Sequence, residues 1–240
     1  MIVDKINRDL FGEHGFDGRN WAMTFAEKFA LSGILSQRRP AIALEIGTLN
    51  GGSLSIISHY SQKVYSIDSN PEVREKLSSQ FQNVTFLTGK SQEVLPDLIA
   101  SLNDSESEVG FALIDGDHTE DGVKRDILEV LNYQPEAPFW LLMHDSFNPD
   151  CRKGMKSVDW NAFPCVHWVN YDFIPGFLSN IPGWEDQMWC GMALAYLDQE
   201  KREGPLQFGE LLGRQFSKIL PLSQHAEAAP AHSPAAETLP

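Results

Sequence analysis

From residue 41 onward, short apolar segments alternate with segments in which the apolar residues follow helical spacing. The expected strands are residues 41–46, 64–67, 84–87, 109–114 and 139–143. The expected helices are residues 53–60, 71–80, 93–102 and 119–131. Strands that alternate with helices in this way pair in parallel through right-handed crossovers. The alternation therefore predicts a doubly wound α/β fold.

The segments on either side of this alternation have different patterns. Residues 1–39 carry apolar residues at near-helical spacing, which Pro40 interrupts, so we expect a helical segment there. After residue 150 the alternation weakens: residues 165–171 and 188–197 could be two further strands, and residues 206–219 a last helix. Residues 224–240 are rich in Ala and Pro, contain no aromatic residue and predict a disordered tail. The expected main domain is therefore residues 40–223.

The charge balance limits the partners that this chain can bind. Its 19 Lys and Arg residues face 33 Asp and Glu residues, which gives a formal net charge of −14. Such an acidic surface repels phosphate backbones and anionic lipids, so we expect neither nucleic acid nor a membrane as a partner. Cys151, Cys165 and Cys190 are odd in number and widely spaced, which favours a reducing compartment. With no apolar run near the ~20 residues of a membrane span, we expect a cytoplasmic protein.

The residues that end the strands are the informative ones, because ligands of such sheets bind outside the carboxyl ends of the strands. At the first strand end, Gly47 and Gly51 let the backbone approach a ligand, in a pattern that differs from the dinucleotide-binding G-x-G-x-x-G. Asp68 ends the second strand and could accept both hydroxyls of a ribose or cap the next helix. Ser91 and Gln92 follow the third strand and could bind an adenine edge or begin a helix.

Acidic residues end the fourth and fifth strands. Asp115 and Asp145 should face one cavity, because adjacent strands lie about 4.8 Å apart. Two converging carboxylates repel each other unless a cation or a proton lies between them, and Mg²⁺ suits such oxygen ligands. His118 follows Asp115 by three residues, and an ordinary histidine pKa of about 6.5 suits a general base. This edge of the sheet is thus a candidate metal site with a base beside it.

Five segments carry a resemblance to a known family: LEIGTLNGGS, YSIDSNPE, VTFLTGKSQEVLP, LIDGDH and LLMHDS. In this order and spacing they resemble class I S-adenosylmethionine-dependent methyltransferases. More narrowly, they are similar to the metal-dependent O-methyltransferases of the catechol type and of the bacterial sugar and macrolide type. The resemblance covers about residues 40–150. It implies a Rossmann-like seven-stranded sheet, mostly parallel, with an antiparallel last strand.

The resemblance also implies roles for particular residues. The loop after the first strand would bind the methionine portion of S-adenosylmethionine, Asp68 the ribose, and Ser91 and Gln92 the adenine. The full implied cofactor set is Glu45, Gly47, Thr48, Gly51, Ser53, Asp68, Ser91, Gln92 and Asp115. The implied metal ligands are Asp115, His144 and Asp145, and His118 would be the base.

One residue departs from the family pattern, which usually has an acid or amide pair at the fifth strand end. Here the pair is His144-Asp145, and histidine is a poor ligand for Mg²⁺. Four explanations are open. His144 does not bind the metal, Asp117 substitutes for it, a softer ion such as Mn²⁺ or Fe²⁺ replaces the expected Mg²⁺, or the metal site has been lost.

The predicted reaction is methyl transfer from S-adenosylmethionine to a hydroxyl of a small molecule, of the natural-product, sugar or phenol type. Aromatic residues in 1–39 and 146–186 suit an apolar or ring-containing acceptor. The closest alternative is a metal-independent N- or O-methyltransferase that uses a histidine base. A nicotinamide-dependent oxidoreductase and a non-catalytic nucleoside-binding module are further alternatives. A homo-oligomer is compatible with any of these.

Overall fold

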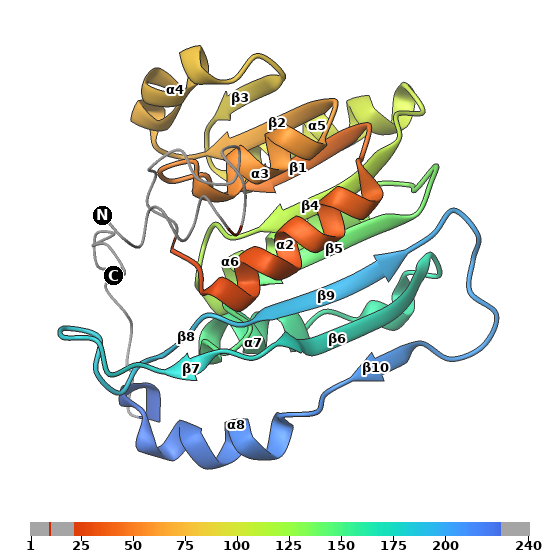
Figure 1. Cartoon of the computed structure of the whole chain (residues 1–240). Coiled ribbons are helices and arrows are strands. Elements are labelled where there is room, and N and C mark those ends of the chain that lie inside the picture. The colour runs from red at the N-terminus through yellow and green to blue at the C-terminus, as the bar shows by residue number, and fades with distance from the viewer. Residues whose placement is uncertain (1–9, 11–21, 227–240) are drawn as a thin grey trace.

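The computed structural model describes residue 10 and residues 22–226, which are built around one eight-stranded sheet (Figure 1). Its strand order is β10-β6-β9-β5-β4-β1-β2-β3. The strands are β1 Ile42–Ile46, β2 Lys63–Asp68, β3 Val84–Thr88, β4 Val109–Ile114, β5 Phe139–His144, β6 Val166–Ile174, β9 Met192–Leu197 and β10 Gln207–Gly209. All neighbours pair in parallel except β9, which is antiparallel to β5 and β6. The predicted doubly wound sheet with an antiparallel late strand is confirmed.

The strand count differs from the seven expected. The additional strand is β10, which we placed inside a helix over residues 206–219 and which instead pairs in parallel with β6 at the edge of the sheet. The helical part of that segment is only α8, Gly213–Ile219. A three-residue edge strand gains its hydrogen bonds from one neighbour, so its own sequence carries little periodic signal.

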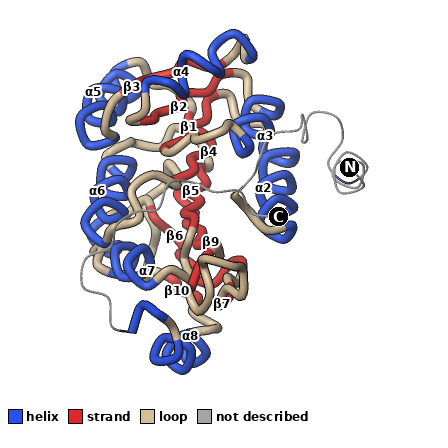
Figure 2. Tube along the Cα trace, turned by 90° about the vertical axis from the view of Figure 1, so that its left-hand side faces the viewer, coloured by secondary structure: helices blue, strands red, loops and turns tan. Residues whose placement is uncertain are grey.

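Helices cover both faces of the sheet (Figure 2). On one face lie α2 Phe25–Arg38 and α3 Gly52–Tyr60, and on the other α5 Ser91–Asp104, α6 Glu120–Leu131 and α7 Pro149–Lys156. Helix α4, Pro71–Leu77, lies at the β3 edge. Short 3-10 helices span Ser78–Gln80, Trp160–Ala162, Leu220–Leu222 and Gln224–Ala226.

Two hydrophobic layers hold the helices to the sheet. In β4, Phe111 and Leu113 pack with the layer of α2 and α3, whereas Ala112 and Ile114 pack with the layer of α5 to α7. Because successive strand residues point to opposite faces, a strand covered on both sides reads as a continuous apolar run. This is why the central strands were visible in the sequence.

The segment after residue 150 differs most from expectation. Helix α7 was not predicted, and the expected strand over residues 188–197 is divided into β8, Met188–Trp189, and β9. Cys190 and Gly191 lie between them with φ angles of 63° and 83°, which no regular strand adopts. Strand β8 pairs instead with β7, Phe177–Leu178, in a separate two-stranded sheet. This kink positions part of the site described below.

Two expectations concern the ends of the chain. Most of the tail expected at residues 224–240 lies outside the described residues, as do residues 1–9 and 11–21 of the N-terminal segment. The division into segments 1–39, 40–223 and 224–240 stays a prediction. Among the described residues, no helix combines the length and hydrophobicity needed to cross a membrane.

Candidate active site

A cavity of about 900 Å³ opens at the carboxyl ends of β1 to β5. Seven of the residues predicted to bind the cofactor line it: Gly47, Thr48, Ser53, Asp68, Ser91, Gln92 and Asp115. The other two, Glu45 and Gly51, are not among the lining residues. The predicted base His118 and the predicted metal ligands also line it. The structure therefore brings strand ends that are far apart in the sequence to a single cavity.

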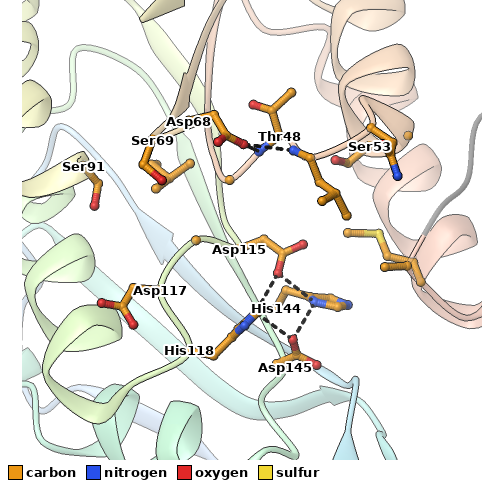
Figure 3. Close-up of a pocket in the computed structure, with 18 of the residues that line it drawn as sticks. Thr48, Ser53, Asp68, Ser69, Ser91, Asp115, Asp117, His118, His144 and Asp145 are labelled. Atoms are coloured by element: carbon orange, nitrogen blue, oxygen red, sulfur yellow. Dashed lines mark hydrogen bonds and ion pairs between the residues drawn. The ribbon is translucent and has the colours of Figure 1, made fainter. Parts of the chain in front are cut away.

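The loop after β1 passes directly over the end of β4. Gly47 has a φ of 86°, and a Cβ there would lie 1.9 Å from the carbonyl oxygen of Asp115, so only glycine fits. Asp68 organises this loop, because its Oδ2 accepts hydrogen bonds from the amides of Thr48 and Leu49, each at 3.0 Å (Figure 3). Its Oδ1 accepts from the amide of Asn70 at 2.8 Å. The ribose role of Asp68 stays a prediction.

Glu45 supports the same loop from within the sheet. It is fully buried, and its Oε1 accepts a hydrogen bond of 2.6 Å from the hydroxyl of Ser53. Burial raises the pKa of Glu45 to about 8, although the hydrogen bond from Ser53 opposes the shift. Glu45 is thus a neutral acid at pH 7 that connects β1 to the first turn of α3.

Asp126 of α6 holds the two residues expected to contact adenine. Its Oδ1 accepts a hydrogen bond from the Ser91 hydroxyl at 2.5 Å and a longer one from Nε2 of Gln92 at 3.4 Å. Burial raises the pKa of Asp126 to about 6. Sequence reasoning missed this residue. Its only signal was an acid beside the apolar stripe of α6 that contains Val123 and Ile127.

Four side chains at the ends of β4 and β5 form a closed ring of donor atoms (Figure 3). Nε2 of His118 lies 3.4 Å from Oδ1 of Asp115 and 3.1 Å from Oδ2 of Asp145. Nδ1 of His144 lies 3.1 Å from the same Asp115 oxygen and 3.2 Å from the same Asp145 oxygen. Two nitrogens and two oxygens therefore alternate around one point. The predicted convergence of Asp115 and Asp145 is present, with a histidine on each side.

The backbone at Asp145 explains how this side chain reaches the ring. Asp145 has a φ of 56°, a left-handed conformation that aspartate tolerates better than most residues and that is concentrated at functional sites. The amide of Cys190, in the kink between β8 and β9, donates a 2.6 Å hydrogen bond to its Oδ1. Asp117 does not join the ring: its Oδ1 accepts from the amide of Thr119 at 2.9 Å, and its side chain points away (Figure 3).

The charges of the ring depend on one another. Burial opposes protonation of His118, but the hydrogen bonds to Asp115 and Asp145 outweigh it and raise the pKa of His118 to about 10. Burial likewise opposes protonation of His144, and the neighbouring carboxylates raise its pKa well above the ordinary value. For Asp115 and Asp145, burial works in the opposite direction, but the adjacent histidines lower both pKa values. The carboxylates of Asp115 and Asp145 thus stabilise positive charge on the imidazoles of His118 and His144.

Glu27 of α2 is a further member of the site that sequence reasoning missed. It is fully buried, and its Oε1 lies 3.2 Å from Nε2 of His144, at ion-pair distance but without the alignment of a hydrogen bond. The same oxygen accepts a 2.6 Å hydrogen bond from the amide of Gly191. Cys190 lies close enough to Glu27 and His144 to share a metal with them, but burial raises the pKa of its thiol. A protonated thiol is a poor metal ligand.

Aromatic side chains adjoin the ring on the side of β7 and β8. The rings of His118 and Trp189 meet edge to face with centroids 5.8 Å apart, and Trp184 meets Trp189 at 5.5 Å. Phe177 lines the same cavity. Several other aromatics that we associated with an acceptor pocket are in the core, among them Phe147 and Trp160. Only part of the aromatic content after residue 146 therefore faces the site.

Residues 44–146 match a family model described as a methyltransferase domain. No curated protein matches the sequence. Among solved structures, the chain is similar to the O-methyltransferase TomG from Streptomyces achromogenes, which is involved in tomaymycin synthesis and was solved with S-adenosylmethionine. The identity is 13%, the TM-score is 0.55, and the match covers 82% of this chain and 89% of TomG.

Two further structures have the same fold. An O-methyltransferase from Bacillus cereus in complex with S-adenosylhomocysteine has 13% identity and a TM-score of 0.54, with 82% of this chain and 91% of that chain covered. Cofactor-bound Rv0187 from MTB has 15% identity and a TM-score of 0.54, with 83% and 89% covered. With the matched family model, these findings confirm the predicted class. Residues 44–146 therefore match a methyltransferase domain, and the chain has the fold of the two O-methyltransferases named above.

Proposed function

We propose that this methyltransferase transfers the methyl group of S-adenosylmethionine to a hydroxyl of a small, ring-containing molecule, with a divalent cation held by Asp115, His144 and Asp145. The observation that carries the proposal is the ring of two carboxylate oxygens and two histidine nitrogens beside the cofactor cavity. The reaction breaks the bond between sulfur and methyl carbon and forms a bond between methyl carbon and oxygen. The hydroxyl proton passes to a base.

The cavity supports the assignment of the cofactor. Two proteins of the same fold were solved with S-adenosylmethionine or S-adenosylhomocysteine. Asp68, Ser91 and Gln92 line this cavity, and we assign Asp68 to the ribose and Ser91 and Gln92 to the adenine. The missing G-x-G-x-x-G motif disfavours a nicotinamide cofactor. The methionine portion would lie along the loop that begins at Gly47.

The donor set fits a divalent cation. Asp115, His144 and Asp145 each offer a donor atom within 4.8 Å of the others, and a cation would neutralise the two converging carboxylates. Imidazole nitrogen favours Mn²⁺, Fe²⁺ or another transition metal over Mg²⁺, so we expect one of these ions. Held by Asp115, His144 and Asp145, such an ion would supply Lewis-acid chemistry that lowers the pKa of the attacking hydroxyl.

His118 is the proposed base. Its side chain is 40% exposed, so an acceptor entering from the Trp189 side can reach it. The carboxylates of Asp115 and Asp145 raise the pKa of His118, so its proton must leave before the imidazole can act as a base. A cation held by Asp115, His144 and Asp145 would offset the negative charge that favours the protonated imidazole.

The test compares three variants with the wild-type enzyme. Asp115→Asn and Asp145→Asn should each abolish the stimulation by Mn²⁺ and most of the turnover. Asp145→Asn should change S-adenosylhomocysteine affinity by no more than a few-fold, because Asp145 is not among the predicted cofactor residues. His118→Ala should keep the metal and lose roughly 10²–10⁴-fold in rate, the usual contribution of a general base. Its residual activity should rise with pH, as the acceptor deprotonates by itself.

The measurements are metal content by elemental analysis, cofactor affinity by titration calorimetry, and turnover with a panel of phenolic and sugar acceptors. Ser69→Ala is a matched control, because Ser69 lines the same cavity but lies outside the ring of donor atoms. Full activity of wild-type enzyme that has been shown to contain no metal, in excess chelator, would contradict the metal proposal. The metal-independent methyltransferase would then be the better description.

A further inference from the structure

Glu27 is a buried acid that lies outside the matched methyltransferase segment, on the helix that precedes β1. Its Oε2 accepts hydrogen bonds from the amide of Thr24 at 2.6 Å and from the Thr24 hydroxyl at 2.8 Å, which completes a capping box at the start of α2. Capping needs only this oxygen. The other oxygen, Oε1, faces the interior, where it contacts the amide of Gly191 and His144.

We propose that Glu27 is a positioning residue for His144: its carboxylate keeps the ring proton on Nε2, so that the lone pair of Nδ1 faces the metal between Asp115 and Asp145. The inference rests on the proposed metal site and assigns it a residue from the N-terminal helix. In this role Glu27 would contact neither the metal nor the substrate, and it would act only through His144.

The reason is the chemistry of a neutral imidazole. Such a ring has one N–H and one lone pair, and only the nitrogen with the lone pair can bind a metal. In metal sites the second ring nitrogen commonly donates its N–H to a carboxylate, which fixes the tautomer and the orientation of the ring. Nδ1 of His144 is the nitrogen that faces Asp115 and Asp145. Nε2 lies 3.2 Å from Oε1 of Glu27, at ion-pair distance, so a small rotation of the imidazole would align the hydrogen bond that this role requires.

The kink between β8 and β9 holds the carboxylates on both sides of the His144 imidazole. Consecutive amides do this: the amide of Cys190 donates to Asp145 and the amide of Gly191 donates to Glu27, each at 2.6 Å. A Cβ at Gly191 would lie 2.8 Å from the amide nitrogen of Gly176, and the φ there is 83°, so glycine is required. The same two residues therefore connect α2 to the end of β5.

The experiment measures metal binding directly, without turnover. Mn²⁺ affinity is determined by calorimetry on the full chain, and nitrogen coordination is detected by pulsed electron paramagnetic resonance of the bound Mn²⁺. Glu27→Gln removes the charge and should lower Mn²⁺ affinity about 10–100-fold, the usual cost of losing a partner of a metal-binding histidine. The nitrogen signal of His144, assigned by its loss in His144→Asp, should weaken in parallel.

Thr24→Ala is the matched control. It removes the hydroxyl of the capping box but leaves Glu27 facing His144, so Mn²⁺ affinity should stay within about two-fold of wild type. Should Glu27→Gln fail to fold, Glu27→Asp keeps a carboxylate at the start of α2 but is one methylene too short to reach Nε2. It should show the same loss of Mn²⁺ affinity. Folding is checked by S-adenosylhomocysteine affinity.

Two results would overturn the inference, and they are distinguishable. If a folded Glu27 variant binds Mn²⁺ as tightly as wild type, with an unchanged nitrogen signal, Glu27 has only a capping role and the metal proposal is unaffected. If wild-type protein binds neither Mn²⁺ nor Co²⁺, the metal proposal itself fails, and this inference fails with it.

Discussion

Three buried or largely buried acids position other residues of this site, and each contacts a different neighbour. Glu45 accepts from Ser53 beneath the loop, Asp126 holds Ser91, and Glu27 faces His144. A buried carboxyl is costly unless it is hydrogen-bonded, paired or neutral. Glu45 is the neutral case, because burial raises its pKa to about 8. Its protonation therefore couples the stability of the fold to pH.

Glu45→Gln tests this coupling. The unfolded wild-type chain releases the Glu45 proton near pH 4.5, whereas the folded chain holds it to about pH 8, so wild-type stability falls as the pH rises through this window. Glutamine cannot titrate. The unfolding free energy of the variant relative to wild type should therefore rise by about 3 kcal/mol between pH 4 and pH 7. Urea unfolding at several pH values measures it, and a difference that does not change with pH would contradict the assignment.

At the scale of the elements, one buried arginine connects the late part of the chain to the sheet. Arg152 of α7 pairs with Asp172 of β6 at 2.9 Å and with Glu210, just after β10, at 3.0 Å. It also donates to the carbonyl of Ser146, next to the site residue Asp145. The side chains of Arg152 and Asp172 are only 3% and 2% exposed. Strand β6, the edge strand β10 and the end of β5 thus share one network of ion pairs and hydrogen bonds.

Arg152→Met should destabilise the protein by about 3–5 kcal/mol, because it leaves the buried Asp172 carboxylate without its partner. The double variant Arg152→Met with Asp172→Leu should recover much of this loss, since no charge is then left unpaired. Urea unfolding of the two variants and of Asp172→Leu alone completes the cycle. A loss below about 1 kcal/mol for Arg152→Met would show that the pair contributes little.

At the scale of the whole molecule, the ligand cavity joins the ends of five strands, β1 to β5, so cofactor binding should stabilise the complete fold. A ligand present at 100 times its dissociation constant adds about 2.7 kcal/mol to the unfolding free energy. For a chain of this size we expect S-adenosylhomocysteine to raise Tm by about 5–10 °C. NAD at the same concentration should leave Tm unchanged.

Thermal unfolding with each ligand measures this effect. Asp68→Ala should weaken S-adenosylhomocysteine binding by about 1.5–3 kcal/mol, the cost of losing charge-assisted hydrogen bonds, and should shrink the shift in Tm accordingly. A shift caused by NAD and absent with S-adenosylhomocysteine would favour the oxidoreductase alternative. An undiminished shift in Asp68→Ala would remove the ribose assignment.

Local sequence patterns predict the order and type of the elements from residue 41 to residue 144. The expected strands end within one residue of β1 to β5, because each is a short, largely apolar run bounded by polar or glycine residues, and the central β4 and β5 are buried on both faces. The convergence of Asp115 and Asp145 also followed, since parallel strands that are neighbours have their carboxyl ends at one edge. These features depend on local periodicity and on the handedness of crossovers, which short segments encode.

The surroundings of His144, in contrast, depend on tertiary packing. Glu27 and Gly191 meet across 164 positions of sequence, and no local pattern records that contact. In the sequence, Glu27 is simply the third residue of a helix that Thr24 caps. The break at Cys190, the edge strand β10 and the role of Asp126 likewise depend on neighbours that the fold supplies. Side-chain partners across layers are set by packing, which periodicity does not encode.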